Sequence, residues 1–219
     1  MIEVRENCRR VLDRIREAAV RSGRDSNAIR LIAVTKKVST GNIRQATECG
    51  ISHIGENRLQ EALPKREALH DVPLTWHFIG HLQTNKAKKA VETFDWIQSV
   101  DRAELAEKLN QSTAKAIPVL IEVKLHEEGK KSGIAESALG PLVEQFRQYP
   151  QLQLRGLMAI PPFFENPEDV RPYFRKLRRL GEQFGLPELS MGMSNDFEVA
   201  VEEGATMVRI GTALFGERQ

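Results

Sequence analysis

The feature that most constrains the fold of this chain is the regular alternation of short apolar segments with longer amphipathic ones. Eight apolar segments rich in β-branched residues recur along the 219 residues, and segments with helical spacing separate them. The expected strands cover 31–35, 52–55, 74–80, 95–100, 117–125, 152–160 and 188–194, with the eighth inside 206–216. Alternation of this kind predicts a parallel sheet covered by helices.

A closed barrel accommodates eight such units better than an open sheet does. The open doubly wound sheet is the structural alternative, but its G-x-G-x-x-G fingerprint after the first strand is absent. An additional helix is expected over 2–22, where apolar residues recur at helical spacing. No composition shift marks a second domain. We therefore expect one α/β domain over 1–219, a single (β/α)8 TIM barrel whose leading segment 1–24 packs on the barrel, with no second β domain.

Composition excludes several classes of function. Lys plus Arg number 32 against 30 Asp plus Glu, and this balance gives no electrostatic reason to expect nucleic acid or a membrane as a partner. The densest basic run, RKLRR at 175–179, is interpreted as a solvated helix face. Cys8 and Cys49 stand alone, without zinc-ligand spacing. The charged N-terminus and the absence of a membrane-length apolar run complete the expectation of a soluble, cytoplasmic protein with reduced thiols and no metal.

Polar residues follow several of the predicted strands, at the barrel end where chemistry is usually located. Each alone is weak evidence, since loops generally begin with polar residues, but together they indicate a site. Strand by strand, they are Lys36; Glu56 and Asn57; His77, with His81 beyond it; Lys124; Met158; Ser194; and Arg209 with Gly211 and Thr212.

Two glycine-containing segments after the last two strands indicate an anion site. They are GMSND at 192–196 and RIGTALFG at 209–216. Small residues at a helix start leave backbone N–H groups free to hold an anion, and Ser194 and Thr212 add hydroxyl groups. Ordinary helix caps and a tight turn are the alternative. The occurrence of both segments together favours a phosphate site.

A lysine near such a site suggests Schiff-base chemistry. Lys36 follows the first strand, where loss of hydration would lower the pKa of its amine and make it a usable nucleophile. A sugar phosphate, as in class I aldolases, and pyridoxal phosphate both fit an amine beside a phosphate pocket. Arg209 alternates with Val208 and Ile210 and should point into the barrel, where a pyridine nitrogen would give it an acceptor. A structural ion pair with Glu56 is the competing interpretation.

The sequence also resembles a known family. The segments LIAVTK, HIGEN, WHFIGHLQTNK, KSG (131–133), RGLMAIPP, LSMGMSND and MVRIGTALFG are similar, in this order, to the motifs of the pyridoxal-phosphate homeostasis protein family. The resemblance runs from about residue 31 to 216. It implies a single-domain barrel of the alanine-racemase type, fold type III, that carries pyridoxal 5′-phosphate as an internal aldimine.

The resemblance also implies roles for individual residues. Lys36 matches the aldimine lysine, whereas Lys37 stands where many members have threonine, and strand alternation should turn the two side chains to opposite sides. Of the matched residues, Ser194, Gly211 and Thr212 would hold the phosphate, Arg209 would meet the pyridine nitrogen, and Asn57, His77 and Met158 would line the cofactor. Gln83, Asn85 and Lys86 match a further motif to which we assign no role.

The residues favour a holder of the cofactor over an efficient catalyst. A racemase needs an acid/base group on each face of the substrate carbon, and alanine racemases supply one as a tyrosine from a second domain. Here Tyr149 and Tyr173 are the only tyrosines, and neither follows a predicted strand. We expect a monomer that acts in vitamin B6 homeostasis and amino-acid and keto-acid balance, with apo-enzymes that require the cofactor as candidate recipients. An amino-acid racemase is the alternative.

Overall fold

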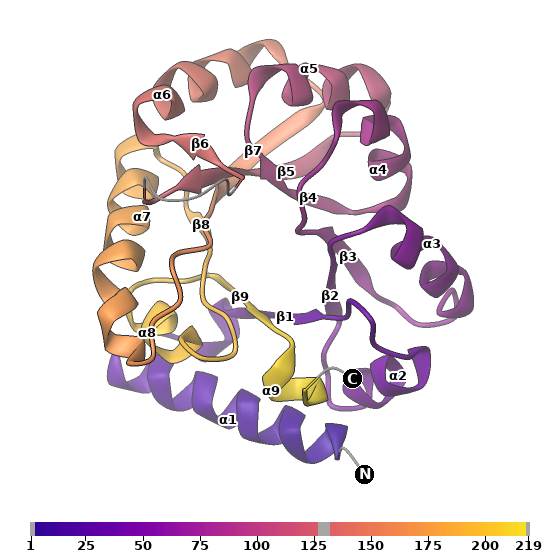
Figure 1. Cartoon of the computed structure of the whole chain (residues 1–219), viewed down its shortest axis with the longest axis vertical. Coiled ribbons are helices and arrows are strands. Elements are labelled where there is room, and N and C mark those ends of the chain that lie inside the picture. The colour runs from indigo at the N-terminus through magenta and orange to yellow at the C-terminus, as the bar shows by residue number, and fades with distance from the viewer. Residues whose placement is uncertain (1–2, 127–131, 218–219) are drawn as a thin grey trace.

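Eight parallel strands close into a barrel in the computed structural model, which describes residues 3–126 and 132–217 (Figure 1). Each strand pairs with its neighbour around the ring, β4 pairs with β5, and β9 returns to pair with β1. The barrel strands are β1 (Arg30–Val34), β2 (His53–Glu56), β3 (Thr75–Phe78), β4 (Trp96–Val100), β5 (Ile117–Lys124), β7 (Leu152–Met158), β8 (Glu188–Ser190) and β9 (Met207–Ile210). The closed ring confirms the predicted (β/α)8 barrel, and the open-sheet alternative is wrong.

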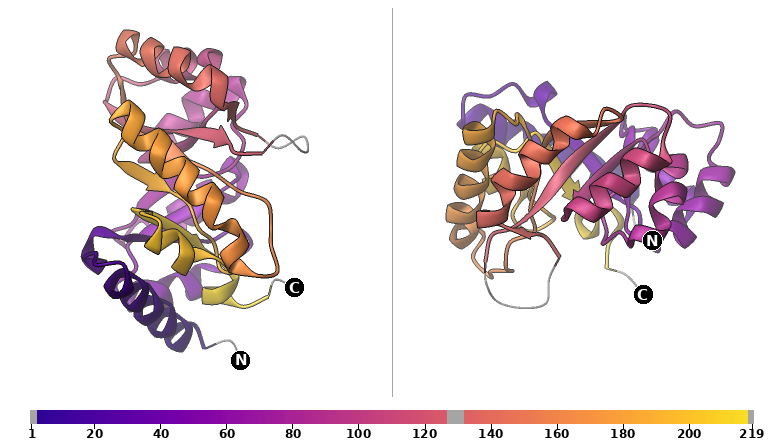
Figure 2. Two further views of the ribbon diagram at one scale, coloured as in Figure 1. Left: turned by 90° about the vertical axis from the view of Figure 1, so that its left-hand side faces the viewer. Right: turned by 90° about the horizontal axis from the view of Figure 1, so that it is seen from above.

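Helices form a layer around this ring, as the two side views make clear (Figure 2). They are α1 (Val4–Arg21), α2 (Thr40–Thr47), α3 (Leu59–Ala68), α4 (Ala87–Thr93), α5 (Ala103–Ser112), α6 (Glu136–Gln145), α7 (Arg171–Phe184), α8 (Phe197–Glu202) and α9 (Thr212–Phe215). Short 3-10 turns cover Ser26–Ala28, Thr84–Lys86, Phe146–Gln148 and Pro167–Val170. Among the helices described, none has the length and apolar character needed to cross a membrane.

The additional helix α1 lies outside the ring against α8 and α9 (Figure 1). Its apolar stripe is fully or almost fully buried and consists of Val4, Cys8, Val11, Ile15, Ala18 and Ala19, spaced so that they share one helix face. Polar contacts at the edges of this face also join α1 to α8 and α9. Arg14 pairs with Glu198 of α8 at 2.6 Å, and the Asn7 amide donates to the Leu214 carbonyl at 3.0 Å. The expected leading helix is therefore present and packed on the barrel.

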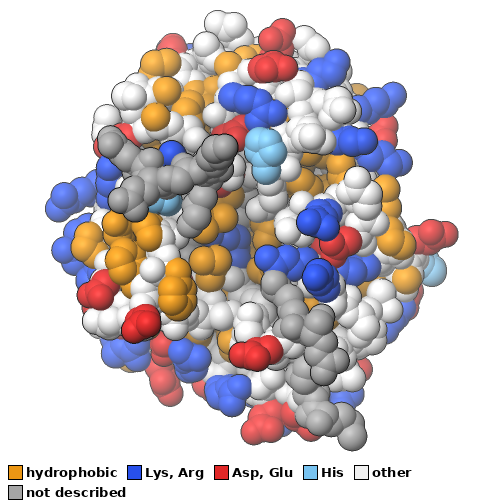
Figure 3. Space-filling model, in the orientation of Figure 1, with side chains coloured by type: hydrophobic (Ala, Val, Ile, Leu, Met, Phe, Trp, Pro, Cys, Tyr) orange, Lys and Arg blue, Asp and Glu red, His pale blue; other side chains and the backbone are white. Residues whose placement is uncertain are grey.

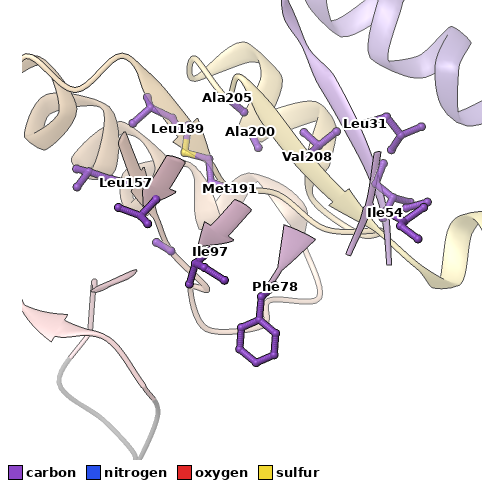
Figure 4. Packing of buried hydrophobic residues seen from close by; sticks show 14 of the residues in the cluster. Leu31, Ile54, Phe78, Ile97, Leu157, Leu189, Met191, Ala200, Ala205 and Val208 are labelled. Atoms are coloured by element: carbon purple, nitrogen blue, oxygen red, sulfur yellow. The ribbon is translucent and has the colours of Figure 1, made fainter. Parts of the chain in front are cut away.

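Strand alternation divides the apolar core into an outer and an inner part. The outer part fills the space between strands and helices and includes Leu31, Ile54, Phe78, Ile97, Leu157 and Val208 (Figure 4). The inner part lies within the ring and is small: Ile32, Leu120, Met158 and Met207. Since so few apolar side chains fill the ring, much of its interior is left to polar residues, described below.

Two details differ from the sequence-based expectation. A short strand, β6 (Ile134–Ala135), pairs in parallel with the end of β5, in a region where no strand was expected. Conversely, the strand predicted over 188–194 ends at Ser190. Gly192 adopts a φ of 90°, which no regular strand residue has, and this breaks the strand even though the Gly192 carbonyl still accepts a hydrogen bond from the Arg209 N–H at 2.9 Å.

Candidate functional site

Lys36 lies in a tight turn just after β1, at the carboxyl end of the barrel strands. The Val38 N–H closes the turn on the Thr35 carbonyl at 2.9 Å. Lys37 has a φ of 58°, and its N–H donates to the Glu61 carboxylate at 3.0 Å. Lys36 is half-buried and Lys37 is exposed, as expected. The reason differs from the prediction: a turn, and not strand alternation, separates the two side chains.

A buried ion pair between β2 and α3 anchors the start of this turn. Glu56 is fully buried, and its Oε1 accepts from the Thr35 hydroxyl and from the Lys65 ammonium, both at 2.7 Å. The ammonium of Lys65 also donates to the Thr35 carbonyl at 2.6 Å. The competing interpretation of Arg209, an ion pair with Glu56, is therefore wrong, because Glu56 is paired with Lys65 instead.

Arg209 points into the barrel, as its alternation with outer-core residues predicted. Only 3% of the residue is exposed. Its guanidinium donates to the Ser190 hydroxyl at 2.7 Å and to the Ala159 carbonyl at 2.9 Å. Burial lowers the pKa of Arg209 to about 10, against the opposing pull of Glu122 and Asp196, so the group stays charged at neutral pH. Within 3–126 and 132–217, no ion pair joins Arg209 to a carboxylate.

The segments after β8 and β9 meet at Ser194. Its hydroxyl oxygen accepts from the backbone N–H groups of Gly211 at 3.3 Å and Ala213 at 3.2 Å. Gly192 cannot be replaced freely, since a Cβ there would lie 2.5 Å from that of Ala200. The structure thus brings the predicted phosphate residues Ser194, Gly211 and Thr212 together. Because Ser194 Oγ already accepts, its own hydrogen remains available for an anion.

The three residues expected to line a cofactor lie at different depths. Asn57 follows β2, is half-buried, and has a buried Oδ1 without a hydrogen-bond partner in the described part of the chain. His77 is fully buried inside β3, and burial holds the pKa of its imidazole well below the usual range. Met158 ends β7 within the inner core. His77 and Met158 are thus interior residues of the barrel.

Several polar residues near the site were not singled out from the sequence. Gln98 and Ser190 are fully buried and bonded to one another at 2.7 Å. Alternation with Trp96 within DWIQSV could have placed Gln98 inside the ring. Glu122 accepts from the Ser132 hydroxyl at 2.7 Å, which gives the KSG motif a contact on β5, although Lys131 of that motif lies outside the described residues. Burial raises the pKa of Glu122, and the Ser132 hydrogen bond opposes this.

A pocket of about 580 Å³ opens beside Asn57 on the same face of the barrel. Gln83 and Lys86, from the motif without an assigned role, contribute to its lining together with Gly80 and His81. Figure 3 shows this face, with several Lys and Arg side chains gathered near its middle.

Taken together, the groups at this end of the barrel suit a phosphorylated aromatic aldehyde. Lys36 supplies an amine, and the Ser194 and Gly211 segments supply hydrogen-bond donors for an anion. Arg209 supplies a buried cation to which no carboxylate of the described residues is bonded. Arg209 distinguishes pyridoxal phosphate from a sugar phosphate, because a buried guanidinium whose N–H groups are not all bonded needs a further acceptor. A ring nitrogen would be such an acceptor.

Comparisons with known proteins agree with this geometry. The family model for the alanine racemase N-terminal domain matches residues 6–219. The chain is 49% identical to the pyridoxal phosphate homeostasis protein of Aquifex aeolicus, covering 98% of both, and 45% identical to that of Pseudomonas aeruginosa, covering 100% of this chain and 97% of the relative.

Solved structures show the same fold. PipY of Synechococcus elongatus, solved with PLP bound, is 41% identical with a TM-score of 0.81, covering 94% of this chain and 100% of that one. Alanine racemase of Corynebacterium glutamicum is 18% identical with a TM-score of 0.73, covering 98% of this chain and 60% of that chain. The latter likeness shows the fold alone.

Proposed function

The chain belongs to the pyridoxal phosphate homeostasis protein family, and from this premise we propose that it binds pyridoxal 5′-phosphate covalently and serves intracellular vitamin B6 homeostasis. The observation that carries the proposal is the combination, at one end of the barrel, of a half-buried lysine with a buried arginine that has no carboxylate partner in the described part of the chain. The PLP-bound structure of PipY supports it further.

Each residue of the site then has a proposed role. Lys36 forms the aldimine: its amine adds to the cofactor aldehyde and water is lost. Ser194 and Thr212 would hold the phosphate through their hydroxyl groups, and Gly211, whose N–H donates to Ser194 Oγ, would let the backbone come close. Arg209 would donate to the ring nitrogen, and Asn57 would line the cofactor with its Oδ1, which has no hydrogen-bond partner among the described residues. His77 and Met158, both fully buried, would line the cofactor from within the barrel.

We propose that the protein holds and delivers the cofactor rather than catalysing a reaction efficiently. Neither tyrosine lies at a strand end: Tyr149 packs on Phe146, with ring centroids 5.7 Å apart, and Tyr173 lies in α7. No tyrosine is therefore placed to serve as the second acid/base group that a racemase needs. The protein would act as a cytoplasmic monomer that supplies apo-enzymes and so influences amino-acid and keto-acid balance.

The test combines an absorption spectrum with chemical reduction. Purified protein loaded with pyridoxal phosphate should show a visible band, borohydride should fix a pyridoxyl group, and mass spectrometry should locate it on Lys36. The Lys36→Ala variant should lose the band, whereas the matched Lys37→Ala variant should keep it. A protein that stays colourless with added cofactor would refute the proposal. Racemase turnover well above that of free pyridoxal phosphate would identify an enzyme instead.

A further inference from the structure

A continuous chain of hydrogen bonds crosses the interior of the barrel from Arg209. The Arg209 guanidinium donates to the Ser190 hydroxyl at 2.7 Å, and this hydroxyl donates to Gln98 Oε1 at 2.7 Å. Gln98 Nε2 lies 2.9 Å from His77 Nδ1, and His77 Nε2 lies 3.0 Å from His53 Nδ1. The hydrogen bonds thus run from β9 to β8, cross the ring from β8 to β4, and continue through β3 to β2, which only β1 separates from β9.

The direction of every bond in this chain follows from its first member. A guanidinium has donors only, so Ser190 Oγ must accept from it and can give its single hydrogen to Gln98. Gln98 therefore presents its carbonyl to Ser190 and its NH₂ to His77. The second hydrogen of this NH₂ faces the Met207 sulfur at 3.4 Å. His77 must accept at Nδ1, which places its hydrogen on Nε2, toward His53.

Burial makes this arrangement costly to change. Ser190, Gln98 and His77 are fully buried. A reversed amide would place an NH₂ group against the Ser190 hydroxyl, whose hydrogen would lose its acceptor even if His77 changed tautomer. His77 also stays neutral, because burial and the nearby charges of His53 and Arg30 all disfavour its cation. The hydrogen bonds from Arg209 to His53 therefore have one stable set of donors and acceptors.

We propose that Ser190 and Gln98 are positioning residues that fix the Arg209 guanidinium toward the ring nitrogen of the bound cofactor. This inference rests on the proposed function. Together with the Ala159 carbonyl at 2.9 Å, Ser190 occupies two of the guanidinium N–H groups and fixes its plane. The remaining N–H groups can then donate only to acceptors that lie in this plane. An amide cannot relay a proton readily, so the chain orients Arg209 and does not conduct protons.

This orientation has an electronic consequence for the cofactor. A neutral partner at Ser190 leaves the charge of Arg209 uncompensated by any bonded carboxylate within the described residues. A fixed cation that donates to the ring nitrogen disfavours protonation of that nitrogen and weakens the ring as an electron sink. The hydrogen-bond chain would thus suit storage of the cofactor better than catalysis with it.

The experiment compares two ligands that differ only at the ring nitrogen. The first is pyridoxal phosphate, and the second is its analogue with a C–H in place of that nitrogen. Ser190→Ala and Gln98→Met should each weaken pyridoxal phosphate binding about tenfold, the equivalent of about 1.4 kcal/mol, and shift its absorption band. Binding of the analogue should change less than about twofold. Ser190→Thr, which keeps the hydroxyl, should restore most of the affinity.

The matched control is Ser99→Ala on β4. Ser99 is also buried on a barrel strand, but its hydroxyl has no hydrogen-bond partner among the residues described. The Ser99→Ala variant should bind both ligands with the affinity of the parent protein. The inference is overturned if the Ser190 and Gln98 variants keep the parent affinity and spectrum, if they weaken both ligands equally, or if Ser99→Ala has the same effect.

If the proposed function itself were wrong, the result would differ, because the parent protein would then bind neither pyridoxal phosphate nor its analogue. The hydrogen-bond chain is testable even so. In the ligand-free protein, the guanidinium NMR signal of Arg209 should shift on Ser190→Ala and stay unchanged on Ser99→Ala. An unshifted signal in the folded Ser190→Ala variant would overturn the inference.

Discussion

Replacing Lys65 with methionine tests whether the buried ion pair at the start of the Lys36 turn stabilises the fold. Methionine keeps most of the apolar stem of the side chain and removes the ammonium. Glu56, fully buried, would then retain only the Thr35 hydroxyl as a partner at Oε1, and its Oε2 already lacks one within 3–126 and 132–217. The carboxylate would be left as a buried and uncompensated charge.

The expected cost follows from this burial. The Lys65 side chain is only 13% exposed, so water cannot easily replace its ammonium. Removing one partner of a buried pair typically destabilises a protein by about 3–5 kcal/mol. A domain of this kind is stable by about 5–15 kcal/mol, so Lys65→Met should remove a large fraction of the free energy of unfolding. Loss of the bond to the Thr35 carbonyl should also loosen the turn that carries Lys36.

Urea unfolding followed by tryptophan fluorescence measures the effect, since Trp76 and Trp96 both lie in barrel strands. Adding Glu56→Gln to Lys65→Met should restore stability, although Glu56→Gln alone should reduce it. The matched control Lys108→Met, on the exposed face of α5, should change stability by less than about 0.5 kcal/mol. A loss below about 1 kcal/mol for Lys65→Met, or no rescue by the second substitution, would refute the reasoning.

Three further predictions concern the barrel core. Gly156→Ala should cost several kcal/mol or prevent folding, because the new Cβ would lie 1.8 Å from the Glu188 carbonyl; a thermal melt close to that of the parent would contradict this. Burial lowers the pKa of His53 and of His77, so the unfolded chain binds protons that the native protein excludes, and stability should fall as pH drops below about 6.5. Urea midpoints at pH 7.5 and 5.5 measure this, and His53→Gln should reduce the difference. Burial raises the pKa of Cys8 to about 12, so a thiol reagent should modify only the other cysteine of the native protein; prompt reaction of both would be evidence against the packing of α1.

The spacing of apolar residues predicted the fold well because each barrel strand has one face toward the helices and the other toward the ring interior. Each strand alternates between the helices and the ring interior, so segments such as 31–35 and 206–216 could be recognised locally. The same alternation correctly turned Arg209 inward. The presence of the barrel and its helices follows from local pattern and order along the chain. The positions of Lys36 and Asn57 just after their strands follow in the same way, whereas His77 and Met158 lie inside the barrel and not on its rim.

Partners across the ring could not be predicted in this way. Alternation shows which face a residue occupies, but the shear of a barrel decides which inward residues meet. For this reason the contact between Gln98 and Ser190 was missed, since the two residues lie far apart in sequence and meet only inside the closed ring. The error at Glu56 has another cause: Glu56 follows Ile54 by two residues and lies with it on the helix side, where it pairs with Lys65 and not with Arg209. The early end of β8 depends on a positive φ at Gly192 that the sequence pattern does not reveal.

The pairing of β9 with β1 has a consequence for biosynthesis. Lys36 follows the first barrel strand, whereas Arg209 and the Ser194–Gly211 contact belong to the last part of the ring. A nascent chain therefore exposes Lys36 on the order of ten seconds before the residues that complete its surroundings are translated, at about 5–20 residues per second. During that interval the lysine has no completed pocket, and neither edge of the unfinished sheet is covered by its final neighbour. The ring and the ligand site would then be completed in the same late step, so a ribosome-stalled chain that lacks β9 should be both unable to take up the ligand and prone to aggregation.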